Sequence, residues 1–325
     1  MREAKKLMLG LVTLLLPCFA IFPAMAAELK KINFGYSTIG AMATGGWMAK
    51  EIGAFEKYGI HADLIYIGSG PLFVQALIGG NLHGGIGASA AIINAIVNGA
   101  PIVGVAGTAH RPYHRLWVQP EITRVEDLRG KTLGVTRLGS MTDNLTRILL
   151  RKHGMEDAVQ IRQLGGSPEV GAAFQQRAIV GSVTSDLRIG EHVPAKVLIN
   201  LVDFGIPYSM NMIPVFHDYY RRYPEIVEGM VRAYTEGVAA LHQDKPRALK
   251  VIAKYSRRTQ AKHLEDHYQD AVTYLERIPR VEPESVSTIL EFEGKKNARL
   301  ETFFDNSIVD RMVREGFIDR LYKNR

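Results

Sequence analysis

Strand-like and helix-like segments alternate along the first third of the sequence, and this alternation restricts the fold more than any other feature. Apolar strand patterns are separated by helix patterns and by short turns that contain glycine. We expect strands over 32–36, 62–67, 84–88 and 101–106, and helices over 40–56, 72–78 and 89–98. Strands that alternate with helices across short loops form parallel sheets with right-handed crossovers. The sequence therefore predicts an α/β fold.

The same alternation starts again in the middle of the chain. We expect strands over 131–135, 161–164, 179–184 and 197–202, and helices over 140–151 and 167–177. From Pro224 onward the apolar residues recur at helical spacing, which predicts a helical tail. Its helices are expected over 224–241, 245–255, 264–276, 283–292 and 307–322.

Two α/β units in one chain predict two lobes with a ligand cleft between them. The chain would pass between the lobes at two crossovers, near 107–111 and 203–208, so that the second lobe is an insertion in the first. We expect lobe 1 to comprise 27–109 and 205–325, and lobe 2 to comprise 110–204. Ligands of open α/β sheets bind beyond the carboxyl ends of the strands, which places the predicted site in this cleft.

The first 26 residues have the features of a secretory signal peptide. A basic start is followed by an apolar run over 7–22, and Ala24 and Ala26 fit the small-residue cleavage rule. The apolar run is shorter than the roughly 20 residues that a membrane span needs, although an uncleaved anchor is the alternative. We expect cleavage after Ala26 and export to the periplasm. Cys18 is the only cysteine, so the exported chain would have neither disulfides nor thiolate chemistry.

Four segments, 33–37, 80–87, 126–135 and 223–234, carry a resemblance to a known family. In their order and spacing, the chain resembles the sulfonate/nitrate/taurine-type (SsuA-like) periplasmic solute-binding proteins of ABC transporters, a family that includes binders of thiamine precursors. The Asp-Leu-Arg-Gly-Lys run within the third segment is the most recognisable. The family usually has acidic residues where His83 stands and near Gly181-Ser182, so the sequence departs from it there.

The resemblance implies a two-lobed periplasmic-binding-protein fold of type II, with two hinge crossovers. It also implies a small-molecule ligand, an ABC permease in the inner membrane with a cytosolic ATPase, and a monomeric protein. We expect no cofactor. The alternatives are an enzyme or a sensor on the same fold.

Residues that follow the predicted strands, or begin the predicted helices, are the candidate ligand-binding residues. Helix N-termini offer unpaired N–H groups that hold anions, and an arginine can bind an anion through two hydrogen bonds. The alternative is helix capping or a plain surface position. The candidates are Ser37, Thr38, Gly70 and Ser89 in lobe 1, His110 and Arg111 at the first crossover, and Arg137, Ser140, Thr142 and Thr184 in lobe 2. Asp143 would repel an anion, so we expect it to cap its own helix.

The pattern of charges and histidines indicates binding without catalysis. The formal net charge of +7 is spread along the chain, which does not indicate a nucleic-acid surface. His263 and His267 lie four residues apart on a predicted helix, but the sequence between them is not that of a zinc protease, so no metal site is predicted. We expect an organic anion as the cargo, such as a sulfonate, nitrate or carboxylate. A pyrimidine or another aromatic compound is the alternative.

Overall fold

A computed structural model describes residues 29–186, 189 and 192–323, and its strands form two separate sheets. The first sheet has the order β2-β1-β3-β10-β4. Its strands are β1 (Lys30–Tyr36), β2 (Ile60–Tyr66), β3 (Gly84–Ala88), β4 (Ile102–Gly107) and β10 (Asn211–Phe216). Strand β1 runs parallel to β2 and β3, whereas β10 runs antiparallel to both of its neighbours.

The second sheet is built from the middle of the chain and has the order β7-β6-β8-β5-β9. Its strands are β5 (Arg115–Val118), β6 (Thr132–Val135), β7 (Gln160–Gln163), β8 (Gly181–Thr184) and β9 (Lys196–Asn200). The chain passes between the sheets twice, over 108–114 and over 201–210. The two-sheet α/β fold predicted from the sequence is confirmed. The exact lobe boundaries, 109/110 and 204/205, stay a prediction.

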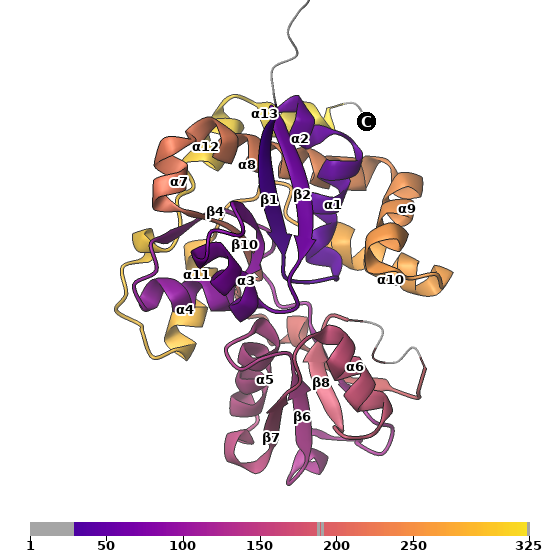
Figure 1. Ribbon diagram of the computed structural model, residues 1–325. Coiled ribbons are helices and arrows are strands. Elements are labelled where there is room, and N and C mark those ends of the chain that lie inside the picture. Colours follow the sequence, from indigo (N-terminus) through magenta and orange to yellow (C-terminus); the bar gives the residue numbers. More distant parts are fainter. Residues whose placement is uncertain (1–28, 187–188, 190–191, 324–325) are drawn as a thin grey trace, which may run out of the picture.

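Helices cover both sheets, and most of them belong to lobe 1, the upper part of Figure 1. Lobe 1 carries α1 (Thr44–Glu51), α2 (Ala54–Lys57), α3 (Gly70–Ile78), α4 (Ser89–Val97), α7 (His217–Arg222), α8 (Pro224–Gln243), α9 (Lys245–Ser256), α10 (Ala261–Tyr274), α11 (Pro283–Phe292), α12 (Ser307–Arg314) and α13 (Phe317–Tyr322). Lobe 2, below it, carries α5 (Met141–Lys152) and α6 (Ser167–Gln175).

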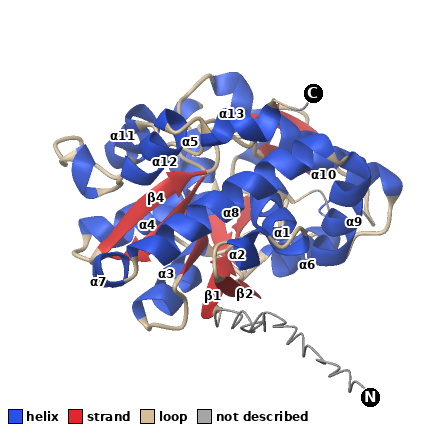
Figure 2. Ribbon diagram, turned by 90° about the horizontal axis from the view of Figure 1, so that it is seen from above, coloured by secondary structure: helices blue, strands red, loops and turns tan. Residues whose placement is uncertain are grey.

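Helix α8 is the central packing element of lobe 1, seen among the other helices in Figure 2. It packs on α1 at very short range, because both helices present glycines at the contact. A methyl group added to Gly237 would lie 2.1 Å from the carbonyl oxygen of Gly45. Trp47 on α1 and Tyr234 on α8 are fully buried beside this contact. The glycines therefore let two helix backbones approach, and large side chains fill the space around them.

Glycines also explain where the helices differ from the sequence prediction. The helix expected over 40–56 is divided into a 3-10 turn (Ala41–Ala43), α1 and α2, and Gly53 adopts a left-handed conformation with φ of 71° between the last two. The helix expected over 307–322 is divided in the same way at Gly316, where φ is 63°. A side chain is disfavoured in this conformation, so glycine marks both breaks.

The two departures from the family pattern have structural reasons. The Asn33 backbone N–H donates to Nδ1 of His83 over 3.0 Å, and burial lowers the pKa of His83, so the neutral ring serves as the acceptor. A side chain at Gly181 would lie 2.5 Å from the Trp117 carbonyl oxygen, which leaves no room for an acid. Ser182 is fully buried and donates to the Gly134 carbonyl over 2.7 Å.

The predicted signal peptide, residues 1–26, lies outside the described residues. Within the part of the chain that is described, none of the helices combines the length and the apolar character needed to cross a bilayer.

Candidate functional site

A small polar cavity of about 40 Å³ lies where the two lobes meet. Its lining comes from the carboxyl ends of strands in both sheets and from the first crossover, as the rule for open α/β sheets requires. Lobe 1 contributes Ser37, Thr38, Gly68, Ser69, Gly70, Ala88 and Asn211, the crossover contributes Tyr113 and His114, and lobe 2 contributes Thr136, Ser140, Met141, Thr142, Ser167, Thr184 and Ser185. We call this the cleft cavity.

Three helices begin at the cleft cavity. Helix α3 begins at Gly70 in lobe 1, whereas α5 and α6 begin at Met141 and Ser167 in lobe 2. The first turn of a helix has N–H groups without intrahelical partners and carries a partial positive charge. Helix starts from both lobes therefore give the cavity a favourable potential for an anion without any cationic side chain.

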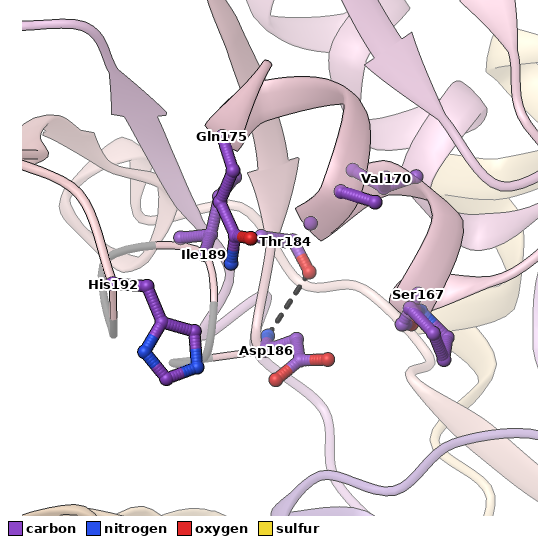
Figure 3. Close-up of a pocket in the computed structure, with 10 residues that line it drawn as sticks. Ser167, Val170, Gln175, Thr184, Asp186, Ile189 and His192 are labelled. Carbon is purple, nitrogen blue, oxygen red and sulfur yellow. Dashed lines mark hydrogen bonds between the residues drawn. The ribbon is translucent and has the colours of Figure 1, made fainter.

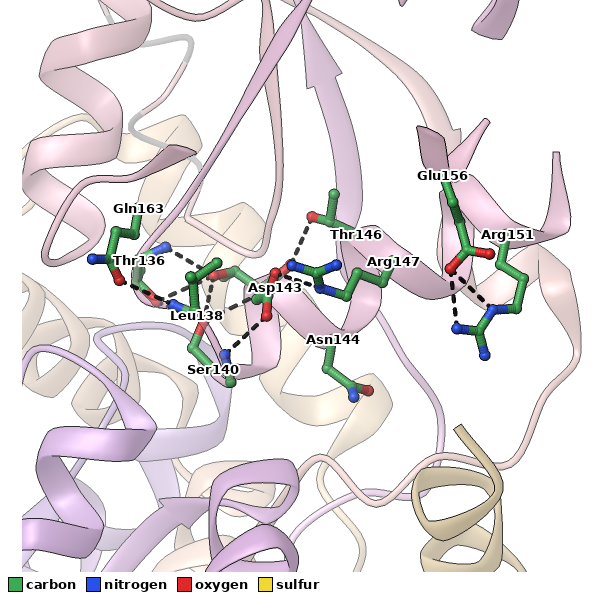
Figure 4. A network of polar contacts seen from close by, with 12 residues as sticks. Thr136, Leu138, Ser140, Asp143, Asn144, Thr146, Arg147, Arg151, Glu156 and Gln163 are labelled. Carbon is green, nitrogen blue, oxygen red and sulfur yellow. Dashed lines mark hydrogen bonds and ion pairs between the residues drawn. The ribbon is translucent and has the colours of Figure 1, made fainter. Parts of the chain in front are cut away.

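The wall in lobe 2 is a compact hydroxyl cluster, drawn in Figure 4. Thr142 Oγ1 lies 2.9 Å from Ser140 Oγ and 3.1 Å from Thr136 Oγ1, and it accepts from the Thr136 backbone N–H over 3.0 Å. Ser140 also caps α5, since its Oγ accepts from the Asp143 N–H over 3.3 Å. The two functions weighed for Ser140, capping and facing the cleft, coexist in one residue.

The carboxylate of Asp143 binds groups outside the lining of the cleft cavity. Its Oδ2 accepts from the Gly139 N–H over 2.8 Å, and its Oδ1 pairs with Arg147 Nε over 3.0 Å. The carboxylate is thus held by its own helix start and by an arginine one turn further along the helix. The residue that caps α5 is Ser140, and Asp143 holds the N–H of the residue before that cap, so the expectation that Asp143 caps its own helix is met only in that it binds at the helix start.

The wall in lobe 1 and the crossover hold buried polar atoms that have no hydrogen-bond partner among the described residues. These atoms are Ser69 Oγ, His114 Nδ1 and Asn211 Oδ1, and the three residues are between 2% and 5% exposed. Ser69 stands at the N-cap of α3, yet its hydroxyl does not cap the helix. Buried polar groups in native proteins are nearly always satisfied. Three unsatisfied groups around one cavity therefore indicate a place for a polar ligand.

The cleft cavity is electrically neutral in its side chains. No Asp, Glu, Lys or Arg stands among its lining residues, all of which are described. Burial, followed by the nearby charge of Arg115, lowers the pKa of His114 to about 3, so its ring is neutral. Burial also raises the pKa of Tyr113, which keeps its hydroxyl protonated. The cavity can therefore offer hydroxyls, an amide and a neutral imidazole to a ligand.

A larger hollow of about 280 Å³ adjoins the cleft cavity on the side of α6 and shares Ser167 and Thr184 with it (Figure 3). Figure 3 shows Thr184 Oγ1 accepting from the Asp186 backbone N–H, a contact of 3.0 Å. Val170 and Ile189 give this hollow an apolar side. Gln175, Asp186 and His192 also line this hollow, so the space next to the cleft cavity suits a portion of the same ligand that has both apolar and polar groups.

Six of the ten candidate residues predicted from the sequence meet at the cleft cavity. They are Ser37, Thr38, Gly70, Ser140, Thr142 and Thr184. Several are held by backbone contacts: Ser37 Oγ accepts from the Ala88 N–H over 3.1 Å, and Thr38 Oγ1 accepts from the Gly40 N–H over 3.0 Å. Such contacts fix the hydroxyls at the strand ends.

The other four candidates do not line this cavity. Ser89 is fully buried and shares a hydrogen bond of 2.8 Å with Ser209. His110 borders a separate hollow near α10, and Arg111 is exposed with its guanidinium 5.8 Å from the Tyr274 ring. Arg137 is partly buried outside the lining. Their contact with a ligand stays a prediction.

Sequence reasoning missed several lining residues. Asn211 begins β10, a strand that the sequence pattern did not reveal, and Tyr113 and His114 follow the predicted crossover directly. Ser69 lies in a turn that was recognised, next to the candidate Gly70. Its position before a predicted helix start could have identified Ser69 as a candidate ligand-binding residue.

A family model matches more than half of the chain. It is described as "NMT1/THI5 like" and matches residues 41–248. A Brucella abortus (strain 2308) protein named "Putative binding protein" is 33% identical over 153 residues, which are 46% of this chain and 47% of that protein. The match thus spans about half the length of this curated relative.

Solved structures with low sequence identity share the fold. The periplasmic nitrate-binding protein NrtA from Synechocystis PCC 6803 has a TM-score of 0.73 at 12% identity, covering 89% of both chains. The alkanesulfonate-binding protein SsuA from Xanthomonas axonopodis pv. citri, bound to MOPS, has a TM-score of 0.72 at 16% identity, covering 88% of this chain and 98% of that one. The desulfurization enzyme DSZB also shares the fold, with a TM-score of 0.62 at 14% identity over 87% of this chain and 99% of that one.

Proposed function

The chain belongs to the NMT1/THI5-like family, and from this premise we propose that it is the substrate-binding component of an ABC-type importer. It would capture a small organic anion in the cleft cavity and deliver it to an inner-membrane permease driven by a cytosolic ATPase. The periplasm is its proposed location, after removal of residues 1–26. Binding proteins for nitrate and alkanesulfonate have the same fold, which supports this cargo class.

The observation that carries the proposal is the cleft cavity itself. Helix starts from both lobes converge on it, and two buried groups around it that can donate to an anion, the Ser69 hydroxyl and the His114 Nδ1 atom, are unsatisfied among the described residues. Hydrogen bonds to a charged group contribute about 1.5–3 kcal/mol each. Micromolar affinity corresponds to about 8 kcal/mol. Four or five such bonds from the lining are therefore sufficient for capture, without an arginine.

The size of the cavity indicates how the cargo lies in the cleft. A volume of about 40 Å³ is well below that of ordinary small-molecule sites, which enclose roughly 300–1,000 Å³. We infer that the cargo places an oxyanion head group in the cleft cavity and extends toward the adjoining hollow near α6. We also infer that the lobes move apart to admit it and close around it, as two-lobed binding proteins do.

Binding without chemical conversion is part of the proposal. The lining holds no cysteine, lysine or carboxylate, and burial lowers the pKa of its one histidine, His114, to about 3, which makes that ring a poor general base for the serines around it. The ligand is instead met by hydroxyls that already hydrogen-bond to one another and to backbone groups.

A neutral nitrogen heterocycle, such as a thiamine-precursor pyrimidine, is the second candidate cargo. His114 Nδ1 and Asn211 Oδ1 are two unsatisfied polar atoms of residues that line the cleft cavity, and Tyr113, next to His114 in the chain, adds an aromatic ring. An amide oxygen accepts, a neutral imidazole nitrogen accepts or donates, and both beside an aromatic ring suit a flat heterocycle that carries N–H groups and ring nitrogens.

A titration panel tests both candidates. We expect isothermal titration of the purified protein to detect binding of a sulfonate, nitrate or carboxylate, and a matching rise in melting temperature. Heat with pyrimidines alone would transfer the proposal to the second cargo. Absence of binding across both classes, with a folded protein, would refute capture at this site.

Two serine variants link the binding to the cleft cavity. Ser69→Ala removes a hydroxyl that makes no hydrogen bond to the described residues, so we expect weaker cargo binding with no loss of stability. Ser182→Ala is the matched control, since its buried hydroxyl donates to Gly134 in the lobe 2 core. We expect it to lower stability by about 1 kcal/mol and to leave affinity unchanged. Equal affinity of Ser69→Ala and the parent protein would contradict the site.

A further inference from the structure

A buried ion pair joins the two lobes beside the cleft. Arg258 lies in the connection between α9 and α10 of lobe 1, and Asp186 follows β8 of lobe 2. Arg258 Nη2 lies 2.8 Å from Asp186 Oδ1, and the two side chains are only 2% and 9% exposed. A pair buried to this degree is screened little by solvent, and removing one partner leaves an uncompensated charge.

A second ion pair joins the same helices to lobe 2. Asp270 on α10 accepts two hydrogen bonds from the guanidinium of Arg115 at the start of β5, with distances of 2.7 and 2.9 Å. This two-point geometry is the strongest form of an arginine–carboxylate pair. Arg115 is paired with Thr184 in the second sheet, and Thr184 precedes Asp186 by two residues. The two ion pairs therefore hold the neighbouring ends of β5 and β8 in lobe 2.

These strand ends carry part of the cleft lining. The Asp186 N–H donates to Thr184 Oγ1 over 3.0 Å, and Ser185 lies between them. A methyl group added to Gly40 in lobe 1 would lie 3.1 Å from Ser185 Oγ, so the lobes touch here. The pairing of Arg258 with Asp186 thus fixes the segment that brings two cleft residues, Thr184 and Ser185, against lobe 1.

The lobes also approach at the far side of the cleft without an ion pair. A methyl group added to Gly166 in lobe 2 would lie 3.5 Å from the Gly68 carbonyl oxygen in lobe 1. The cleft is therefore closed on a cavity of about 40 Å³.

Side chains of α5 join the lobes as well: Asn144 Nδ2 donates to Glu293 Oε1 at the end of α11 over 3.2 Å, and the Arg151 guanidinium lies 4.4 Å from the centre of the Phe292 ring. The two arginine–carboxylate pairs differ from these contacts because they hold the strand ends that carry Thr184 and Ser185.

We propose that Arg258 and Asp270 are positioning residues that brace lobe 2 in the closed arrangement and present Thr184 and Ser185 to the cargo. The brace consists of the Arg258–Asp186 and Asp270–Arg115 pairs. The brace sets the fraction of cargo-free protein that is closed. A smaller closed fraction raises the apparent dissociation constant for the cargo in proportion. The inference rests on the proposed function only for the identity of the cleft as the cargo site.

The test measures lobe separation in cargo-free protein, so it does not depend on finding the cargo. Gln75 on α3 and Arg162 on β7 are exposed and lie in different lobes. We replace both with cysteine in a Cys18→Ser background, attach spin labels, and record distance distributions by pulsed electron paramagnetic resonance. Cys18 is the only native cysteine, so labelling is confined to the two chosen sites.

Arg258→Gln is expected to shift the distribution to longer distances, whereas Arg258→Lys, which keeps the charge, restores most of the parental distribution. Asp270→Asn is the second variant. It removes the carboxylate that faces Arg115, whose side chain is 22% exposed, whereas Arg258→Gln removes the guanidinium that faces Asp186, which is 9% exposed, so Asp270→Asn endangers folding less. Arg232→Met is the matched control. It breaks ion pairs with Glu228 and Glu315 that lie entirely within lobe 1, so it should lower stability without changing the distance.

Unchanged distances in folded Arg258→Gln and Asp270→Asn would overturn the brace. An equal shift in Arg232→Met would overturn it as well, because the effect would then reflect general destabilisation. Once a cargo is known, the two brace variants are expected to bind it about tenfold more weakly with little change in the association rate constant. Loss of binding without a change in lobe distance would contradict the brace and leave the proposed cargo site intact.

Discussion

His267 is expected to make the protein lose stability as the pH falls from 7 to 5. The side chain is only 2% exposed on α10, and its Nε2 shares a hydrogen bond of 2.9 Å with Thr44 Oγ1. Burial, followed by the positive charge of Arg258, lowers the pKa of His267 to about 3 in the folded protein. An unfolded histidine titrates near pH 6.5. Between these values the unfolded chain binds a proton that the folded chain does not, so acid favours unfolding.

The size of the effect follows from the two pKa values. With about 6.5 in the unfolded chain and about 3 in the folded protein, His267 contributes a loss of about 2 kcal/mol between pH 7 and 5. The stability that the neutral, buried ring provides is therefore undiminished above pH 6.5, and it is lost progressively as the pH falls toward 3. His114 has the same direction of shift and a similar folded value, so the parent protein should lose about twice this amount.

Urea unfolding at pH 7, 6 and 5 measures the slope. His267→Gln keeps a polar group near Thr44 but cannot be protonated, so its loss of stability over this range should be smaller than the parent's by about 2 kcal/mol. His217→Gln on the exposed start of α7 is the control and should retain the parental slope. Parallel stability curves for His267→Gln and the parent would refute the reasoning, since His267 would then titrate alike in the folded and unfolded states.

Three further predictions concern packing, the cleft and a turn. Gly237→Ala in α8 should lower the free energy of unfolding, measured in urea, by about 1–3 kcal/mol or more, because the added methyl group meets the α1 backbone. Gly171→Ala in α6 has open space around the added methyl group, so this variant should be neutral or stabilising. Thr142→Val should weaken cargo binding in calorimetry, because it removes a hydroxyl from the cleft cavity at constant volume. Asp127→Asn should lower stability at pH 7, with the difference disappearing near pH 2, because backbone and hydroxyl hydrogen bonds from Thr123 lower the Asp127 pKa to about 2.

The parallel strands could be predicted from the sequence because each is a local apolar pattern next to a helix pattern. The two antiparallel strands could not. Strand β5 has four residues and begins with Arg115, whose charge is paired with Asp270, 155 positions further along the chain. Strand β10 contains Pro214, which cannot donate a ladder hydrogen bond, and the pairing register shifts beside it. Both strands depend on partners distant in sequence, so no local window reveals them.

The candidate site shows the same division. Ser37, Thr38, Ser140, Thr142 and Thr184 could be predicted, because the ends of strands and the starts of helices can be located from local pattern. Asn211 and His114 reach the cleft cavity through the antiparallel strand and the crossover, and neither position carries a local signal. Arg258 could not be predicted at all. Its contact with Asp186 depends on a fold that places the connection between α9 and α10 next to the end of β8.

The positions of the arginines change the argument for an anionic cargo. The sequence suggested Arg111 and Arg137 as clamps, yet the lining of the cleft cavity contains hydroxyls and helix starts instead. A fixed cation beside the cargo would bind it by charge and would also retain it, since a buried ion pair is costly to separate. Helix starts and hydroxyls provide directional hydrogen bonds to an oxyanion at a smaller electrostatic penalty when the lobes open. A carrier must release what it captures, so a neutral lining is consistent with an anion that is bound and then passed on.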